Sequence, residues 1–250
     1  GYISEGRYEV SDFERFDAAT NRWILKDDRQ ISSSIILNEI RPGAMKIRDL
    51  NDDGIINIAD RTFIGNTNPL HTGGISLNAR IYNFDFATYF NWSYGNDVYN
   101  ANKIEYTSTS KYSSRNMLAI MQDGQRWTNL RPDGTISNDP AELEAMNANT
   151  TMWSPYTRSF ALSDWAVEDG SFLRLATATI GYTLPENISK RLKMSNLRVY
   201  ASGYNLFLLT NYTGFDPEVS TRRRTPLTPG VDYSAYPRSR SYVLGLNVNF

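Results

Sequence analysis

The most regular feature of this sequence is an alternation of apolar and polar residues with a period of two. Between residues 83 and 94 the even positions are mostly aromatic, while the odd positions are mostly polar. This period is typical of a β-strand that turns one face to an apolar environment and the other to a polar one. The even-numbered row consists of Phe84, Phe86, Thr88, Phe90, Trp92 and Tyr94.

Further segments share the pattern, and together they predict an all-β fold with strands of about ten residues. Residues 75–81, 172–184 and 242–250 alternate, and residues 197–208 are β-prone but mixed. In the last segment the apolar row is Tyr242, Leu244, Leu246, Val248 and Phe250, and Val243 interrupts the polar row. In residues 172–184 the simple alternation assigns to the apolar row Phe172, Ala176, Ala178, Ile180, Tyr182 and Leu184, and Arg174 interrupts that row.

Helical signals are few. Residues 114–123 and 185–193 favour short helices, the second with Pro185 at a suitable first position. We expect both to be accessory elements. An even number of further strands would also fit between residues 96 and 171.

The connections between the predicted strands differ in length. If the strands form an antiparallel meander, the short connections at 82–83 and 185–196 leave one end of the sheet, and long ones leave the other. Outer-membrane β-barrels sort their loops in this way, with short periplasmic turns and long external loops. The pattern therefore predicts one barrel segment over residues 1–250, with external loops at 40–72, 96–171 and 209–238 and a final strand at 239–250.

The composition of the chain argues against several classes of function. The chain has 26 Lys and Arg against 27 Asp and Glu, so its net charge of −1 argues against a nucleic-acid partner. It has no cysteine and one histidine, His71, which leaves no disulfide framework, zinc cluster or thiol nucleophile. Apolar runs such as 206–209 are far shorter than the roughly 20 residues of a membrane helix, whereas barrel strands need no such run. No arrangement of paired carboxylates, catalytic triad or phosphate loop is present, so we do not expect an enzyme.

Residues 49–60 have the spacing of an EF-hand-type Ca²⁺ loop. A hard cation prefers six or seven oxygen ligands, and Gly54 at the sixth position permits the sharp turn. The final position carries an aspartate where glutamate is usual. The alternative is a loop of Asx turns that holds no metal. The candidate ligands of a structural Ca²⁺ ion are Asp49, Asn51, Asp53, the carbonyl of Ile55, Asn57 and Asp60.

Aromatic residues make up 13% of the chain, and several lie in the long connections. Rings there can stack on a sugar or grip a peptide, and packing inside the loops is the alternative for each of them. The candidate substrate contacts are Tyr99, Tyr106, Trp127, Trp153 and Tyr156. Three features fit a structural role better than a functional one: His71 as a loop histidine, the basic run 222–224 as a solvated loop, and residues 215–218 as a turn.

Several motifs together resemble the SusC/RagA family of TonB-dependent outer-membrane transporters of Bacteroidetes. They occur in the family's order over nearly the whole chain. They are Arg41-Pro42-Gly43, the 49–60 loop, Ile64-Gly65-Asn66 with Pro69 and Gly73-Gly74, residues 167–175, residues 181–185, Asn205-Leu206-Phe207, Gly214-Phe215-Asp216-Pro217-Glu218, and the closing stretch 236–250.

The resemblance implies the C-terminal part of a 22-stranded barrel in the outer membrane of a Gram-negative bacterium. Members of the family import oligosaccharides or peptides with a SusD-like lipoprotein lid, and the TonB complex acts through an N-terminal plug that is not in this chain. The sequence lacks an initiator Met, so we expect it to begin inside a larger domain and to end naturally at Phe250. The remaining strands and the plug would come from the N-terminal part, in the same or another chain.

These inferences make two further predictions. The edge strands should pair with strands outside this chain, and one row of side chains should meet outer-membrane lipid. The membrane-facing candidates are Phe84, Phe86, Phe90, Trp92, Leu244, Leu246, Val248 and Phe250. The alternative function is a soluble, Ca²⁺-dependent β-sandwich that binds glycans, in which the same rings would be buried under a second sheet.

Overall fold

The computed structural model describes residues 1–26, 32–33, 40–109, 114, 116–156, 161–219 and 229–250. The chain divides into two compact units. One unit contains Gly1–Gly65 and Asn100–Val167, and the other contains Asn66–Tyr99 and Glu168–Phe250. The basic run 222–224 lies outside the described residues.

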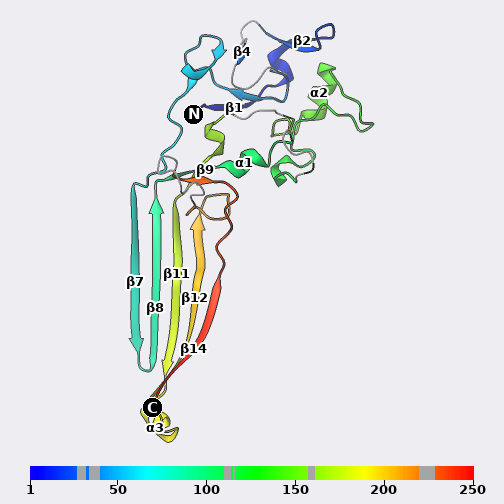
Figure 1. Ribbon diagram of the computed structural model, residues 1–250. Coiled ribbons are helices and arrows are strands. Elements are labelled where there is room, and N and C mark those ends of the chain that lie inside the picture. Colours follow the sequence, from blue (N-terminus) through cyan, green and yellow to red (C-terminus); the bar gives the residue numbers. More distant parts are fainter. Residues whose placement is uncertain (27–31, 34–39, 110–113, 115, 157–160, 220–228) are drawn as a thin grey trace. The chain divides into compact units, whose positions relative to one another are not determined.

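The second unit is built on one five-stranded antiparallel sheet (Figure 1). All the strands expected from the alternation are present, in the order β14-β12-β11-β8-β7. The connections between β7 and β8 and between β11 and β12 are short, and those that follow β8 and β12 are long. The strands are β7 (His71–Ile81), β8 (Phe84–Tyr94), β11 (Phe172–Thr183), β12 (Asn196–Thr210) and β14 (Ser241–Asn249).

Three details differ from the expectation. No described strand from residues 96–171 enters this sheet, because β8 pairs directly with β11. His71 is the first residue of β7 rather than a loop residue, and its Nδ1 accepts a hydrogen bond of 3.1 Å from the Trp92 indole. The predicted helix at 185–193 is present as α3 (Glu186–Arg191), whereas the described part of 114–123 contains only a 3-10 turn at Ala119–Met121.

A β-bulge corrects the predicted faces of β11. The register between β11 and both of its neighbours shifts between Leu175 and Thr177, so the alternation restarts there. Leu173 and Leu175 therefore lie on the apolar face, opposite Trp92 and Phe90. The prediction that Phe172 belongs to the apolar row was wrong, and Arg174, which lies opposite Asn91, does not interrupt that row.

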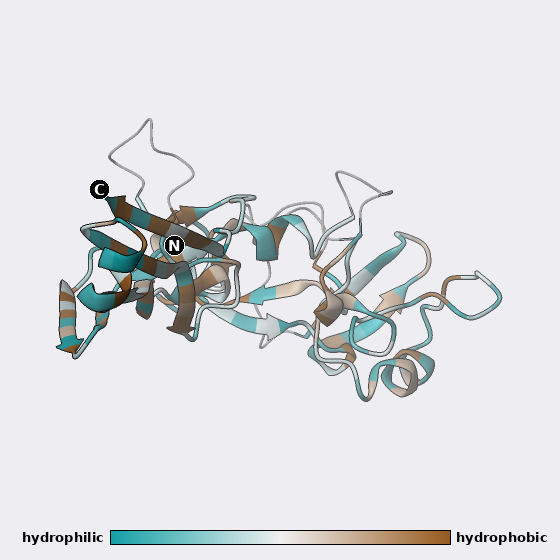
Figure 2. Ribbon diagram, turned by 90° about the horizontal axis from the view of Figure 1, so that it is seen from below, coloured by the Kyte–Doolittle hydropathy of each residue, from teal (hydrophilic) through white to brown (hydrophobic). Residues whose placement is uncertain are grey.

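The register brings the predicted membrane-facing rows together on one face. Phe84, Phe86, Phe90 and Trp92 share it with the alternate residues of the neighbouring strands, and Figure 2 shows the resulting stripes of hydropathy along the sheet. On β14 the same face carries Leu244, Leu246 and Val248, while Phe250 follows the end of the strand. Leu244 is 84% exposed. Within the described residues no second sheet covers this face, which separates the fold from a β-sandwich.

The first unit has small sheets and three apolar clusters. Its strand pairs are β1 (Ser4–Arg7) with β5 (Met45–Ile47), β2 (Phe13–Asp17) with β3 (Arg22–Leu25), and β4 (Ser32–Ser33) with β6 (Ile55–Ile56). Its helices are α1 (Ala101–Glu105) and α2 (Pro140–Asn147). The largest cluster comprises Tyr2, Met45, Ile47, Ile56, Met121, Trp153 and Ala161.

Three remaining strands, β9 (Asp97–Asn100), β10 (Val167–Asp169) and β13 (Val231–Asp232), form a separate sheet in the order β10-β9-β13. None of the helices among the described residues is both long and apolar enough to cross a bilayer.

Candidate functional site

The polar face of the five-stranded sheet carries a cross-strand ion pair. Arg198 on β12 contacts both carboxylate oxygens of Asp85 on β8, at 2.8 Å and 2.5 Å. The guanidinium reaches across β11 at Gly181, where a Cβ would clash with both side chains. The ring of Tyr200 likewise lies over Gly245 of β14. Two glycines therefore make room for the polar side chains that line this face.

A second polar cluster on this face is centred on Arg174. Arg174 is only 2% exposed. Because its guanidinium is charged, its burial requires acceptors for its hydrogen bonds and a compensating negative charge. Its Nη2 donates to Asp216 Oδ1 at 2.7 Å, and Nη1 donates to Asn205 Oδ1. Glu218 approaches Nε at 3.7 Å, and Arg238 bridges Asp216 and Glu218 at 3.5 Å and 3.1 Å. The cluster fixes the segment after β12 to β11.

The same segment is tied at further points. The Tyr212 hydroxyl donates to buried Asp232 at 2.7 Å, and burial together with this carboxylate raises the pKa of Tyr212 above its usual range. Thr213 donates through its backbone N–H and its hydroxyl to Glu168. Residues 215–218 therefore have a structural role, as the sequence favoured, and within them the Phe215 side chain is exposed.

The candidate Ca²⁺ loop is closed by its own backbone. The Asp49 carboxylate accepts from Gly54 N–H at 2.7 Å, and Asn51 and Asp53 accept from N–H groups two residues ahead. Asn57 likewise accepts from Ala59 N–H, while the carbonyl of Ile55 accepts from the Asn57 amide.

Asp60, the last position of the loop, is fully buried. Its two oxygens accept from Leu50 N–H at 2.9 Å and Asn57 N–H at 2.7 Å. Burial opposes ionisation, but these hydrogen bonds outweigh it and lower the pKa of Asp60. Within the described residues no three His, Asp or Glu side chains stand close enough together to hold a metal ion. The oxygen types suit Ca²⁺, and occupancy of the loop stays a prediction.

The five aromatic candidates for substrate contact lie in different surroundings. Trp127 and Trp153 are 4% and 3% exposed and pack in apolar clusters, so their rings are not available to a ligand in this structure. Tyr99 and Tyr106 are partly buried, and burial raises the pKa of Tyr99 to about 12. Tyr156 is 59% exposed. Substrate contact by these residues stays a prediction.

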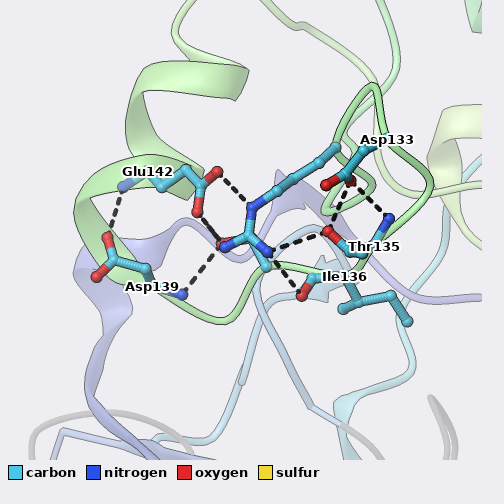
Figure 3. A network of polar contacts seen from close by, with 7 residues as sticks. Asp133, Thr135, Ile136, Asp139 and Glu142 are labelled. Carbon is cyan, nitrogen blue, oxygen red and sulfur yellow. Dashed lines mark hydrogen bonds and ion pairs between the residues drawn. The ribbon is translucent and has the colours of Figure 1, made fainter.

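An ion-pair network in the first unit was not predicted from the sequence (Figure 3). Arg131 contacts both carboxylate oxygens of Glu142, at 2.7 Å and 2.6 Å, and the Ser137 hydroxyl donates to the same carboxylate at 2.5 Å. Asp139 caps α2 by accepting from Glu142 N–H. The start of α2 does have a sequence signal, since Asp139 is a capping residue and Pro140 follows it at the first helical position.

We expect Glu142→Gln to change the pH dependence of stability. Hydrogen bonds from Arg131 and Ser137 lower the pKa of Glu142 from 4.5 to about 2. Because the pKa is depressed in the folded state, the stabilisation is present above the unfolded value and is lost as pH falls toward about 2. The variant should have a lower melting temperature than wild type at about pH 7 and a smaller further loss at about pH 3. Thermal unfolding followed by circular dichroism checks this, with Glu144→Gln on the same helix as the control. Equal pH profiles for wild type and Glu142→Gln would contradict it.

The amino-acid sequence is similar to those of several TonB-dependent receptors. TonB-dependent receptor P3 of Formosa agariphila is 32% identical over 213 residues, which is 84% of this chain and 19% of that receptor. TonB-dependent receptor P39 of the same organism is 33% identical over 215 residues, with the same coverage. The chain belongs to the SusC/RagA family of TonB-dependent receptors. TonB-dependent receptor SusC of Bacteroides thetaiotaomicron is 26% identical over 81% of this chain and 17% of its own length. No protein-family model matches the chain.

Solved structures agree on the fold. The structure described as the RagAB peptide transporter aligns over 83% of this chain and 21% of that chain, with a TM-score of 0.64 and 22% identity. The RagAB peptide importer in the 'closed-closed' state aligns over the whole of this chain with a TM-score of 0.60 and 19% identity. The chain therefore spans about a fifth of the length of the SusC/RagA-family relatives that it matches.

The family motifs gain a physical meaning from the structure. Three of them supply the buried cluster: Arg174 from residues 167–175, Asn205 from the Asn-Leu-Phe motif, and Asp216 with Glu218 from the Gly-Phe-Asp-Pro-Glu motif. The sequence contains the motifs but does not show that they meet, because Asn205 and Asp216 are 31 and 42 residues from Arg174 in the chain. The relatives are receptors and transporters rather than enzymes, in agreement with the sequence.

Proposed function

We propose that this chain forms the C-terminal part of the 22-stranded barrel of a TonB-dependent outer-membrane importer. The observation that carries the proposal is the single five-stranded sheet, whose exposed apolar face has no covering layer among the described residues. Such a face is stable against lipid, and the polar face with Asp85 and Arg198 would then line the barrel interior.

The open edges of the sheet support the same proposal. β7 and β14 are the edge strands, and neither pairs on its outer side with another described strand of the chain. Unpaired backbone groups are too costly to leave in lipid, so both edges require strands from elsewhere. These strands and the plug would come from the N-terminal part of the importer, and the TonB complex would act through the plug.

The relatives support a proposal for the cargo, and the family resemblance supports one for the lid. The RagAB structures are described as peptide transporters or importers, and the SusC relative is a TonB-dependent receptor. We therefore infer a peptide or oligosaccharide as the cargo. A SusD-like lipoprotein would close the barrel over the long connections, including 96–171. The chemistry of such a system is binding and gated passage, in which no bond is made or broken.

Co-purification from outer membranes tests this proposal. A tagged full-length importer containing this chain should need detergent for extraction and should bring a SusD-like lipoprotein with it. Deletion of the full-length gene should abolish growth on the cargo while leaving growth on its monomers intact. Recovery of the tagged protein in buffer without detergent would contradict the proposal.

We further propose that the 49–60 loop binds a structural Ca²⁺ ion. Ca²⁺ at about 100 times its dissociation constant would stabilise the folded state by about 2.7 kcal/mol. The melting temperature of the full-length protein should rise with Ca²⁺ and fall with chelator. Asp49→Asn combined with Asp53→Asn should remove the response, whereas Asp52→Asn, at a position that is not a ligand, should keep it. An unchanged response in the double variant would show that Ca²⁺ acts elsewhere.

A further inference from the structure

The connection between β11 and β12 is a basic segment in a nearly neutral protein. Residues 184–195 contain Lys190, Arg191 and Lys193 against the single acid Glu186, which gives 3 − 1 = +2, while the whole chain has a net charge of −1. Lys190 contacts Glu186 at 2.9 Å, but both side chains are highly exposed. An exposed pair of this kind is weak, so the lysine remains available to another anion.

The same segment exposes two large aliphatic side chains. Ile188 lies in α3, and Leu192 is the C-cap residue that follows it. They are four residues apart, hence on one side of this turn, and they are 44% and 50% exposed. The protein therefore leaves apolar area uncovered directly beside its basic cluster. Neighbouring basic and aliphatic side chains on a short helical turn are characteristic of segments that lie in a membrane interface.

The segment is held in place rather than hanging from the sheet. The Leu192 and Met194 N–H groups donate to carbonyls within α3, and Ser195 N–H donates to Asn249 of β14 at 2.8 Å. α3 also packs against β12. Figure 1 shows it at the end of the sheet where β11 finishes, which is the short-turn end. The exposed apolar face reaches this end of the sheet through Leu246 and Val248.

We propose that residues 184–195 bind the headgroups of anionic phospholipids at the short-turn end of the sheet. The inference rests on the proposed function, because it requires the strands to cross a bilayer. Charge complementarity selects the lipid: Lys190, Arg191 and Lys193 attract phosphate groups, while Ile188 and Leu192 enter the boundary of the acyl chains. The segment then anchors the barrel wall to one leaflet.

Lipid retention by the full-length protein tests this directly. The protein is reconstituted in a mixture of phosphatidylglycerol and phosphatidylcholine, repurified with a narrow lipid annulus, and its lipids are quantified by mass spectrometry. We expect phosphatidylglycerol to be enriched about threefold over the supplied mixture. Lys190→Gln, Arg191→Gln and Lys193→Gln together should return the ratio to that of the mixture. Salt at about 1 M during reconstitution should do the same to the wild type.

A matched variant controls for net charge. Arg15, Arg22 and Lys26 are three exposed basic residues of the first unit, and their replacement by glutamine removes the same charge. This variant should keep the enrichment. Absence of enrichment in wild type, or equal loss in both variants, would overturn the inference. Release of the wild-type protein from membranes by an alkaline wash would instead refute the proposed function, so the two failures can be told apart.

Discussion

Replacing Arg174 by alanine is expected to lower the free energy of unfolding by about 3 to 5 kcal/mol. The substitution would leave the buried carboxylate of Asp216 without its nearest cationic partner. Asp216 is 3% exposed, and the guanidinium of Arg174 lies 2.7 Å from it. A buried carboxylate that loses such a partner keeps the cost of its desolvation without the compensating attraction. The Asn205 amide would lose its contact at the same time. Urea unfolding of the detergent-solubilised full-length protein, followed by tryptophan fluorescence, measures the change.

Arg238→Ala is the matched control for this substitution. Its side chain is about half exposed, and it contacts Asp216 and Glu218 at 3.5 Å and 3.1 Å. Solvent screens such pairs, so its removal should cost about 1 kcal/mol or less. Arg174→Lys should be intermediate, because a lysine cannot reach Asp216 and Asn205 with one planar group. A cost for Arg174→Ala no greater than that for Arg238→Ala would contradict the assignment of Arg174 as the centre of the cluster.

The second large effect is expected at Leu244 on β14. This side chain is 84% exposed, so its replacement by arginine removes almost no packing within the chain. Any cost must therefore come from what surrounds the protein. If the apolar face meets lipid, Leu244→Arg should destabilise the barrel by about 2 to 4 kcal/mol near the bilayer midplane. Equilibrium unfolding in lipid vesicles is the measurement.

Val243→Arg provides the comparison, because Val243 is the adjacent residue and lies on the opposite face. It replaces an aliphatic residue by the same cation, and it should cost less than 1 kcal/mol if that face is hydrated. The difference between the two substitutions separates membrane contact from the general effect of a charge. Equal costs for the two would mean that the two faces meet the same environment.

Four of the five long strands, of nine to twelve residues each, could be predicted from sequence because their side chains alternate, and the fifth, β12, could be predicted because its residues are β-prone. The period of two is a local property, and it reflects the two different environments that the faces meet. α3 was predictable for a similar reason, since Pro185 precedes it directly. By contrast, the small sheets of the first unit were missed, because strands of two to five residues leave too few positions for a period to appear.

The register of the strands could not be read from sequence. The bulge between Leu175 and Thr177 inserts an extra residue relative to β8, and this exchanges the faces of Phe172 and Leu173. Nothing local to residues 172–184 marks this shift except Arg174 in an apparently apolar row. That charge marks the polar face of β11 and does not interrupt its apolar row.

The candidate sites were predicted to different extents. The spacing of residues 49–60 identified a loop rich in oxygen ligands, and Asn51 and Asp53 do form the turns of that loop. The aromatic residues were harder to place, because an indole in a long connection can pack inward as well as outward. Trp127 and Trp153 pack inward, since the first unit buries its apolar clusters with them. The sequence pattern within one connection does not contain that information.

Residue-by-residue fluorescence quenching along β8 tests most directly whether one face of the sheet meets lipid and the other meets water. Single cysteines carrying a fluorophore are placed at Phe84, Phe86 and Phe90, and at Asp85, Ala87 and Asn91, in the full-length protein in vesicles. We predict that the even positions are quenched by a lipid-bound quencher and the odd positions by a water-soluble one. The same response in both rows, or even positions shielded from both quenchers, would contradict it.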